Sequence, residues 1–168
     1  GKGFTDISKK AGIWNRAFSL SVTIIDVNED GYPDIYIGND YLEPDNLYVN
    51  QKNETFKDEW DKYMRHICHF SMGTDIADIN NDGLMDIGTL DMMPADNYRQ
   101  KQNGTAMRLE RYTQLLTAGY GHQIMRNMLQ LNNGKGGFNE IACLAGMHHT
   151  DWSWAPLLAD FDNDGFKD

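Results

Sequence analysis

The sequence predicts an all-β protein built from β-propeller blades: about three partial blades of a larger propeller, with a short helical insertion. Three observations lead to this prediction. A nine-residue acidic pattern occurs as DVNEDGYPD (26–34), DINNDGLMD (78–86) and DFDNDGFKD (160–168). A phenylalanine precedes each copy by 22 residues. Short alternating runs flank the copies, at about four expected strands per unit of about 50 residues, as in radial β repeats.

The expected strands follow the same order in each unit. One run leads into the acidic loop, a second leaves it, and two shorter runs complete the set. In the first unit the runs are SVTIID (21–26), DIYIGN (34–39), NLYVN (46–50) and TFKDEW (55–60), and in the second TDIADI (74–79) and DIGTL (86–90) flank the loop. Their β-branched, alternating composition excludes a stack of helical repeats.

The phenylalanines Phe4, Phe56 and Phe138 define the units. We expect one partial propeller over residues 1–168, with units at about 4–55 and 56–137 and a truncated unit at 138–168. An aromatic-serine pair recurs inside each interval, at 18–19, 70–71 and 152–153. The repeat is therefore one of structure and not only of a loop.

An insertion interrupts the second unit. The first two loops are 52 residues apart and the next two are 82 apart, a difference of 30. Because NLYVN and MLQLN (128–132) each end six residues before a repeat phenylalanine, the extra residues lie between about 91 and 127. Met107, Leu109, Leu115 and Leu116, with charges between them, predict one or two short helices. The segment is locally basic. It is either a solvated decoration on one edge of the propeller or a contact for a ligand or partner.

The acidic loops carry the chemistry. Positions 1, 3, 5 and 9 bear side-chain oxygens, the glycine at position 6 permits a sharp turn, and the carbonyl at position 7 adds a fifth oxygen. Oxygen donors without imidazole or thiolate favour Ca²⁺ over Mg²⁺, so we expect up to three calcium ions. The expected ligands are Asp26, Asn28, Asp30, Tyr32 and Asp34 in the first loop, Asp78, Asn80, Asp82, Leu84 and Asp86 in the second, and Asp160, Asp162, Asp164, Phe166 and Asp168 in the third.

Two other kinds of loop share part of this pattern. An EF-hand needs a glutamate at position 12 and flanking helices, whereas these loops have Ile37 and Thr89 there and strands on both sides. A polar turn without metal fits a single copy, but turns alone do not require aspartate at positions 1, 5 and 9 each time.

Composition limits the function classes. A formal net charge of −10 and a pI near 4.8 argue against nucleic acid as a partner. The sequence has no apolar run long enough to span a membrane. Cys68 and Cys143 are either a disulfide or two buried thiols.

Enzymatic residues are not arranged in a known motif. The segment HICH (66–69) offers candidate bases and a thiol, but the other units have unrelated residues there, which favours packed or surface histidines. The same holds for His148 and His149. We therefore expect a protein without catalytic residues. Trp14, Trp60, Trp152 and Trp154 are expected to pack the blades, with a binding surface near Trp154 as the alternative.

The loops and their flanking strands resemble FG-GAP repeats, seen in integrin α-subunit propellers and in bacterial VCBS-type proteins. NLYVN, TFKDEW and WSWAPLLADFDNDG are similar to bacterial proteins that pair such repeats with an ASPIC/UnbV-type domain. The resemblance implies a propeller of usually about seven blades, calcium loops on one rim, and a location outside the cytoplasm: extracellular, periplasmic or at the outer-membrane surface of a bacterium. The 30-residue insertion is longer than a plain connection between strands.

These expectations lead to two hypotheses of function. The first is a surface module that recognises a protein or glycan, with structural calcium. The alternative is a propeller that scaffolds a carbohydrate-active or other hydrolytic enzyme. Either way, we expect the chain to be a fragment of a longer protein, or to be completed by partners, because a closed propeller needs about four to eight blades.

Overall fold

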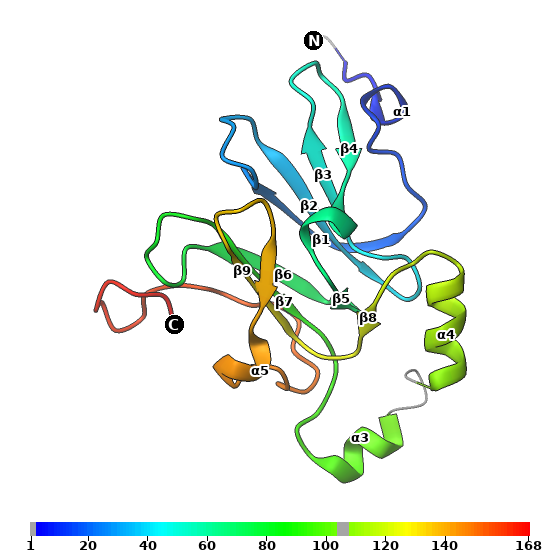
Figure 1. The fold of residues 1–168 in the computed structure, drawn as a ribbon, viewed down its shortest axis with the longest axis vertical. Coiled ribbons are helices and arrows are strands. Elements are labelled where there is room, and N and C mark those ends of the chain that lie inside the picture. The colour runs from blue at the N-terminus through cyan, green and yellow to red at the C-terminus, as the bar shows by residue number, and fades with distance from the viewer. Residues whose placement is uncertain (1–2, 104–107) are drawn as a thin grey trace.

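Two four-stranded antiparallel sheets form the framework of the computed structural model, which describes residues 3–103 and 108–168 (Figure 1). They confirm the expected all-β class. The first sheet has the order β1 (Phe18–Ile25), β2 (Asp34–Asp40), β3 (Asn46–Asn50) and β4 (Phe56–Asp58). The second has the order β10 (Phe138–Glu140), β9 (Met128–Asn132), β7 (Asp86–Leu90) and β6 (Gly73–Ala77).

The sheets are offset from the sequence units by one strand. Phe56 begins β4 and Phe138 begins β10, the outer strands of the two sheets. Each sequence unit therefore starts on the outer strand of one sheet and continues into the next sheet. Phe4, at the same place in the first unit, is fully exposed and lies in no strand.

A one-turn helix follows each repeat phenylalanine, which the sequence analysis did not predict. These helices are α1 (Ser8–Ala11), α2 (Trp60–Tyr63) and α5 (Ala142–Ala145). Each begins four residues after its phenylalanine. Gly12 and Gly146 end α1 and α5 in the left-handed conformation, with φ of 79° and 75°. Each repeat therefore includes one turn of helix between its first strand position and the strands that follow, and does not consist of strands alone.

The insertion is helical, as predicted. It contains α3 (Asn97–Asn103), α4 (Leu109–Thr117) and β8 (Gln123–Ile124) between β7 and β9. β8 pairs in parallel with β5 (Ile67–Cys68), which leads into the second sheet. Leu115 is the buried residue of α4 and Leu109 is exposed, while Met107 lies outside the described residues. Arg99 of α3 forms a two-pronged ion pair with Asp151, which fixes the insertion near the third repeat.

The core lies between the two sheets. Tyr36 and Leu47 of the first sheet pack in one cluster with Ile87 and Phe138 of the second. Trp60 of α2 belongs to the same cluster. At the inner strands the contact is polar, because Ser21 Oγ of β1 donates a hydrogen bond to Thr74 Oγ1 of β6 at 3.0 Å.

The segment 152–158, which precedes the third acidic loop, packs on the other face of the second sheet. The Leu158 amide donates to Asp75 Oδ2 at 2.7 Å. A Cβ added at Gly73 of β6 would lie 2.0 Å from the Trp154 carbonyl oxygen. The side chains of Trp14, Trp152 and Trp154 are exposed, which differs from the expectation that they pack the blades, whereas Trp60 is buried as expected.

We expect Gly73→Ala to lower the free energy of unfolding by about 1–3 kcal/mol, because the new methyl group meets backbone that must move. Gly88→Ala is the matched control: its Cβ would lie 3.5 Å from Leu158 Cδ1, an ordinary contact. Urea unfolding of both variants checks this. Equal stability of the two variants would show that the 152–158 segment does not pack on β6.

The two cysteines differ in their exposure to solvent. Cys68 is buried and Cys143 is exposed, and both are free thiols. This excludes both a disulfide between them and the alternative of two buried thiols.

Among the described residues, no helix combines the length and apolar character needed to cross a membrane.

Three equivalent acidic loops as candidate metal centres

The three acidic loops share one backbone path. The first joins β1 to β2, the second joins β6 to β7, and the third ends the chain. Position 4 adopts a left-handed conformation in each, at Glu29, Asn81 and Asn163, with φ of 55°, 57° and 63°. The glycine at position 6 does the same, with φ of 82° to 93°. Two left-handed residues within three positions turn the chain sharply, which explains the need for glycine at position 6.

The aspartate at position 1 holds this turn. In the first loop, Asp26 Oδ1 accepts a hydrogen bond from the Asp30 amide at 3.0 Å, and Oδ2 accepts one from the Gly31 amide at 2.8 Å. Asp78 and Asp160 accept the same pair of bonds at 2.8 to 3.1 Å. The three loops are therefore equivalent in their hydrogen bonds as well as in their sequence.

Positions 3 and 5 repeat as well. Position 3 accepts from the amide of position 5, and position 5 accepts from the amide of position 7. In the first loop these bonds join Asn28 to Asp30 at 3.2 Å and Asp30 to Tyr32 at 2.9 Å. The second and third loops have the same bonds. These bonds leave lone pairs on each side-chain oxygen for a ligand, although Asp82 Oδ2 also accepts a hydrogen bond from Asn80 Nδ2 at 2.9 Å.

The aspartate at position 9 anchors the loop in the sheet. Asp34 Oδ2 accepts from the Val27 amide at 2.9 Å, and Oδ1 accepts from the Asn50 amide of β3 at 2.7 Å. Asp86 does the same with Ile79 and with Asn132 of β9. Both aspartates have no exposed surface. Asp168, the last residue of the sequence, accepts the equivalent loop bond from the Phe161 amide at 2.9 Å.

The buried carboxyls carry an electrostatic cost. Burial raises the pKa of Asp34, and the nearby charges of Asp26 and Asp30 raise it further, against the two amides that lower it. The pKa of Asp86 is raised by burial in the same way, with Asp78 and Asp82 as the neighbouring charges. A cation within each loop would offset this repulsion. Lys52 Nζ lies 3.3 Å from Asp30 Oδ2 but is half exposed, so it compensates little.

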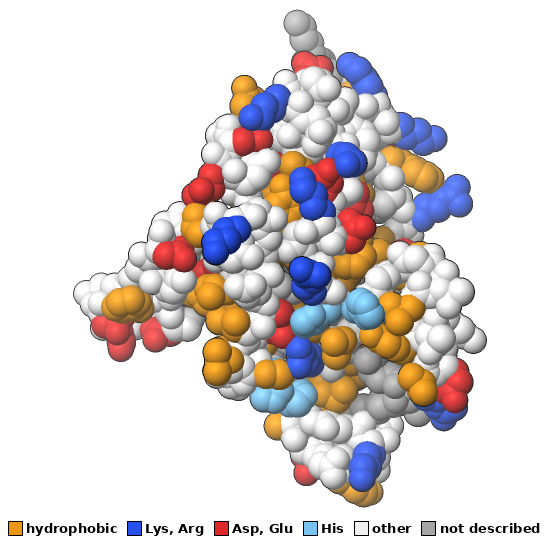
Figure 2. Space-filling view, in the orientation of Figure 1, with side chains coloured by type: hydrophobic (Ala, Val, Ile, Leu, Met, Phe, Trp, Pro, Cys, Tyr) orange, Lys and Arg blue, Asp and Glu red, His pale blue; other side chains and the backbone are white. Residues whose placement is uncertain are grey.

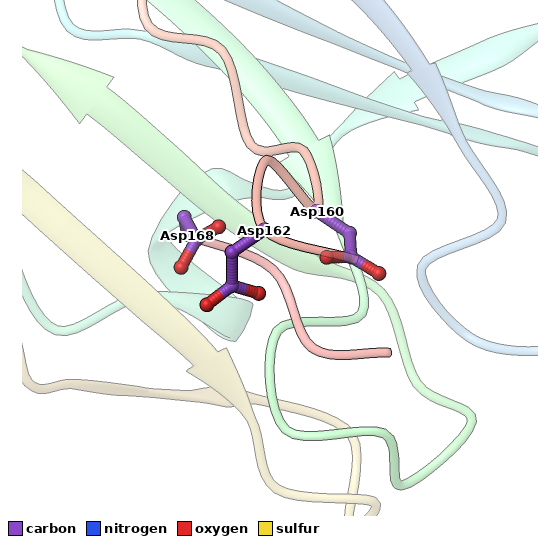
Figure 3. Close-up of side chains that lie close together, drawn as sticks. All are labelled: Asp160, Asp162 and Asp168. Carbon is purple, nitrogen blue, oxygen red and sulfur yellow. The ribbon is translucent and has the colours of Figure 1, made fainter. Parts of the chain in front are cut away.

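The third loop brings its carboxylates closest. One oxygen each of Asp160, Asp162 and Asp168 lie within 4.8 Å of one another (Figure 3). This loop has aspartate at position 3, where the other two have asparagine. The donor set of every loop is oxygen alone, which suits a hard cation such as Ca²⁺. The residues therefore fit the expected metal. One oxygen of Asp164 accepts a hydrogen bond from the Phe166 amide.

The histidine segment does not form one site. His69 is buried and its Nδ1 lies 3.1 Å from Gln123 Oε1, whereas His66 is partly exposed beside Glu140. Cys68 Sγ contacts the carbonyl oxygens of Thr89 and Arg126. Burial raises the pKa of the Cys68 thiol well above its usual value, so this cysteine is not an activated nucleophile.

Two buried carboxyls, which no motif of the sequence reveals, lie at the opposite ends of the strands from the acidic loops. Asp45 accepts hydrogen bonds from Tyr36 Oη at 2.6 Å and from the amide of Asn39 and the hydroxyl of Ser71 at 2.9 Å each. Burial raises its pKa to about 6. Asp91 accepts from the amides of residues 69, 70 and 92, and burial raises its pKa to about 7.

Comparisons with known proteins agree with the repeats. A search among curated proteins finds no match. The family model for the FG-GAP-like repeat matches residues 3–89, just over half of the chain, and spans the first two acidic loops. The chain belongs to the FG-GAP-like repeat family.

Proposed function

We propose that the chain is a calcium-stabilised β-propeller module that recognises a protein or glycan ligand outside the cytoplasm. The observation that carries the proposal is the equivalence of the three acidic loops, which share the same left-handed residues and the same position-1 and position-5 hydrogen bonds. Membership of the FG-GAP-like family supports a propeller-like recognition module. The acidic charge of the chain is then largely a property of the metal loops and gives no reason to expect nucleic acid as a partner.

The metal in this proposal is structural. Side chains at positions 1, 3, 5 and 9, with the carbonyl at position 7, would hold one Ca²⁺ in each loop and would supply the positive charge that these carboxylates lack. The aspartate at position 9 also accepts a hydrogen bond from the backbone amide of Asn50 in β3 or Asn132 in β9. An ion bound to this aspartate would therefore strengthen the link between the loop and that strand. No catalytic role for the metal or for other residues is part of the proposal.

Exposed apolar residues support further blades. Thr74 and Ile76 of β6 face the first sheet, where Thr74 meets Ser21 and Ile76 packs on the core. The matching residues of β1, Val22 and Ile24, are 67% and 60% exposed. Another blade of the same protein, packed as the first sheet packs on the second, would cover them. The propeller and a location at a bacterial surface remain proposals, the latter supported by the resemblance to VCBS-type proteins.

Chelation tests the calcium proposal. We expect the melting temperature in EDTA to lie several degrees below that in excess Ca²⁺, because an ion that binds only the folded state stabilises it in proportion to its affinity. Mg²⁺ at the same concentration should restore less, since it prefers a tighter octahedral site. Differential scanning calorimetry checks this. Identical melting curves with and without calcium would overturn the proposal.

A further inference from the structure

The three acidic loops lie along one edge of the molecule. The turns after β1 and β6 and the loop at the C-terminal end follow one another on the same side of the sheets (Figure 1). Figure 2 shows Asp and Glu side chains along this edge. A direct contact between neighbouring loops would allow an ion bound in one loop to change the affinity of the next.

The second and third loops make such a contact. Asn81, at position 4 of the second loop, donates from Nδ2 to the carbonyl oxygen of Gly165, at position 6 of the third loop, at 2.8 Å. The segments that lead into these loops are joined as well, because the Leu158 amide donates to Asp75 Oδ2 at 2.7 Å. The two loops are therefore fixed to each other both at their entry and at their turn.

The first and second loops are arranged differently. Position 4 of the first loop is Glu29, and a carboxylate offers only acceptors to the carbonyl oxygens of a neighbouring loop. Glu29 and Leu84, one from each loop, line a hollow of about 90 Å³. Among the described residues, no hydrogen bond joins these two loops. The chain thus contains a linked pair of loops and an unlinked pair with the same backbone path.

The linking bond joins two residues that are each enclosed by expected metal ligands. Asn81 separates positions 3 and 5 of the second loop, and Gly165 separates positions 5 and 7 of the third. Both residues hold the left-handed conformation, with φ of 57° and 93°. An ion bound in either loop would fix the backbone on both sides of the bonded residue, and through the bond would restrict the partner loop. A second ion would then have less backbone to order.

We propose that the second and third loops bind calcium cooperatively and that the Asn81 side chain couples them. This inference rests on the proposed calcium function and adds a regulatory property to it, because a coupled pair fills over a narrower range of calcium concentration than independent sites. Repulsion between the two ions opposes the coupling and is screened by salt around these exposed loops. Since that repulsion is the same in variants that keep every carboxylate, such variants isolate the contribution of the hydrogen bond.

The test is calcium titration of the whole chain in competition with a chromophoric chelator, at about 0.15 M salt. Asp30→Ala removes a ligand from the first loop and leaves the linked pair. Adding Asp82→Ala or Asp164→Ala leaves one site at a time and gives its intrinsic association constant. The coupling factor is the product of the two constants of the pair divided by the product of the intrinsic constants. We expect a factor of about three to ten.

A glycine substitution at position 4 removes the linking bond without straining the loop. Asn81→Gly deletes the donor and suits the left-handed conformation, so the coupling factor should fall about threefold or more. Asn163→Gly is the matched control, because Asn163 holds position 4 of the third loop with φ of 63° while the third loop accepts the linking bond through Gly165. This control should keep the coupling factor within about twofold. Intrinsic constants are measured again in each variant, so that changes at a single site cancel.

The unlinked pair provides a second comparison. Asp164→Ala leaves the first and second loops, and we expect their coupling factor to be one or lower, because repulsion remains and the bond is missing. Titration of the chain with all loops intact avoids the alanine variants. There, Asn81→Gly should lower the product of the three association constants about threefold more than Asn163→Gly does.

Four results would overturn the inference. They are a coupling factor of one or lower for the linked pair, an unchanged factor in Asn81→Gly, an equal fall in Asn163→Gly, and equally positive coupling between the first and second loops. The same titrations separate this inference from the proposed function. If calcium binds at independent sites, only the coupling fails. If calcium does not bind, the calcium proposal fails and the coupling fails with it.

Discussion

Replacing Asp86 with alanine is expected to lower the free energy of unfolding by about 2–5 kcal/mol, even without calcium. Asp86 is fully buried and accepts the amides of Ile79 at 3.0 Å and Asn132 at 2.8 Å. Alanine leaves both amides without a partner, and water cannot easily replace the carboxylate at a buried site. Each unsatisfied donor costs about 1–3 kcal/mol. Urea unfolding in EDTA gives the value without a contribution from bound metal.

The chain provides a matched control for this experiment. Asp61 of α2 is an exposed aspartate, and within the described residues its carboxylate accepts no hydrogen bond. Asp61→Ala should therefore cost less than about 1 kcal/mol. Asp86→Asn keeps one acceptor oxygen and should fall between the two. If Asp86→Ala and Asp61→Ala cost the same in EDTA, position 9 contributes to the fold only through metal, and its role as an anchor of the sheet is wrong.

The acidic loops were predictable because their information is local. Glycine at position 6 and an oxygen-bearing residue at positions 1, 3, 5 and 9 describe a turn that folds on its own hydrogen bonds. The strands around them were predictable from alternation: SVTIID and DIYIGN pair in register as β1 and β2, with Ile25 opposite Asp34. The helical insertion followed from comparing offsets between units, which requires no knowledge of packing.

Features that depend on contacts between distant residues were not predictable in this way. The parallel pair of β5 and β8 rests on two residues in each strand, too few for a pattern. Lys62, Arg65 and Lys135 line one surface hollow because the β9–β10 turn folds beside α2. The one-turn helices did leave a signal, since each begins four residues after a repeat phenylalanine, and SKKA and ACLA both end in alanine followed by a left-handed glycine. WDKY of the second unit lacks this ending, so the signal is not common to all three.

Asp45 shows why a buried acid is hard to find from sequence, and also how a repeat can reveal it. Asp45 precedes β3, and Asn127 precedes β9 at the same place in the second sheet. Asp45 Oδ1 accepts a hydrogen bond from the Asn39 amide, near the end of β2, at 2.9 Å. Asn127 Oδ1 accepts one from the Asp91 amide, just after β7, at 2.8 Å. The amide side chain of Asn127 performs this task without charge. We infer that the charge of Asp45 is not needed for the fold.

Asp45→Asn should therefore be tolerated, and should stabilise the protein at pH 8, whereas Asp45→Ala should cost about 3–5 kcal/mol by leaving its buried partners unsatisfied. The buried carboxyl of Asp45 has a pKa of about 6, above the ordinary value of 3.8. The folded state thus holds its proton more tightly than the unfolded state, so this group's contribution to stability is present below about pH 4 and is lost as pH rises through about 6.

The difference between parent and Asp45→Asn removes the contribution of titrating groups that do not interact with Asp45. Asp91, whose pKa of about 7 is raised in part by the charge of Asp45, responds in the same direction. Between pH 5 and pH 8 the parent should lose about 1–2 kcal/mol relative to the variant. Tyr36 and Ser71 can each accept a hydrogen bond from the new amide, so the variant keeps its partners without the charge. Urea unfolding of both proteins at each pH gives the difference. A difference that does not change with pH would mean that Asp45 is ionised in the folded state throughout this range, and that three hydrogen bonds alone stabilise a fully buried carboxylate.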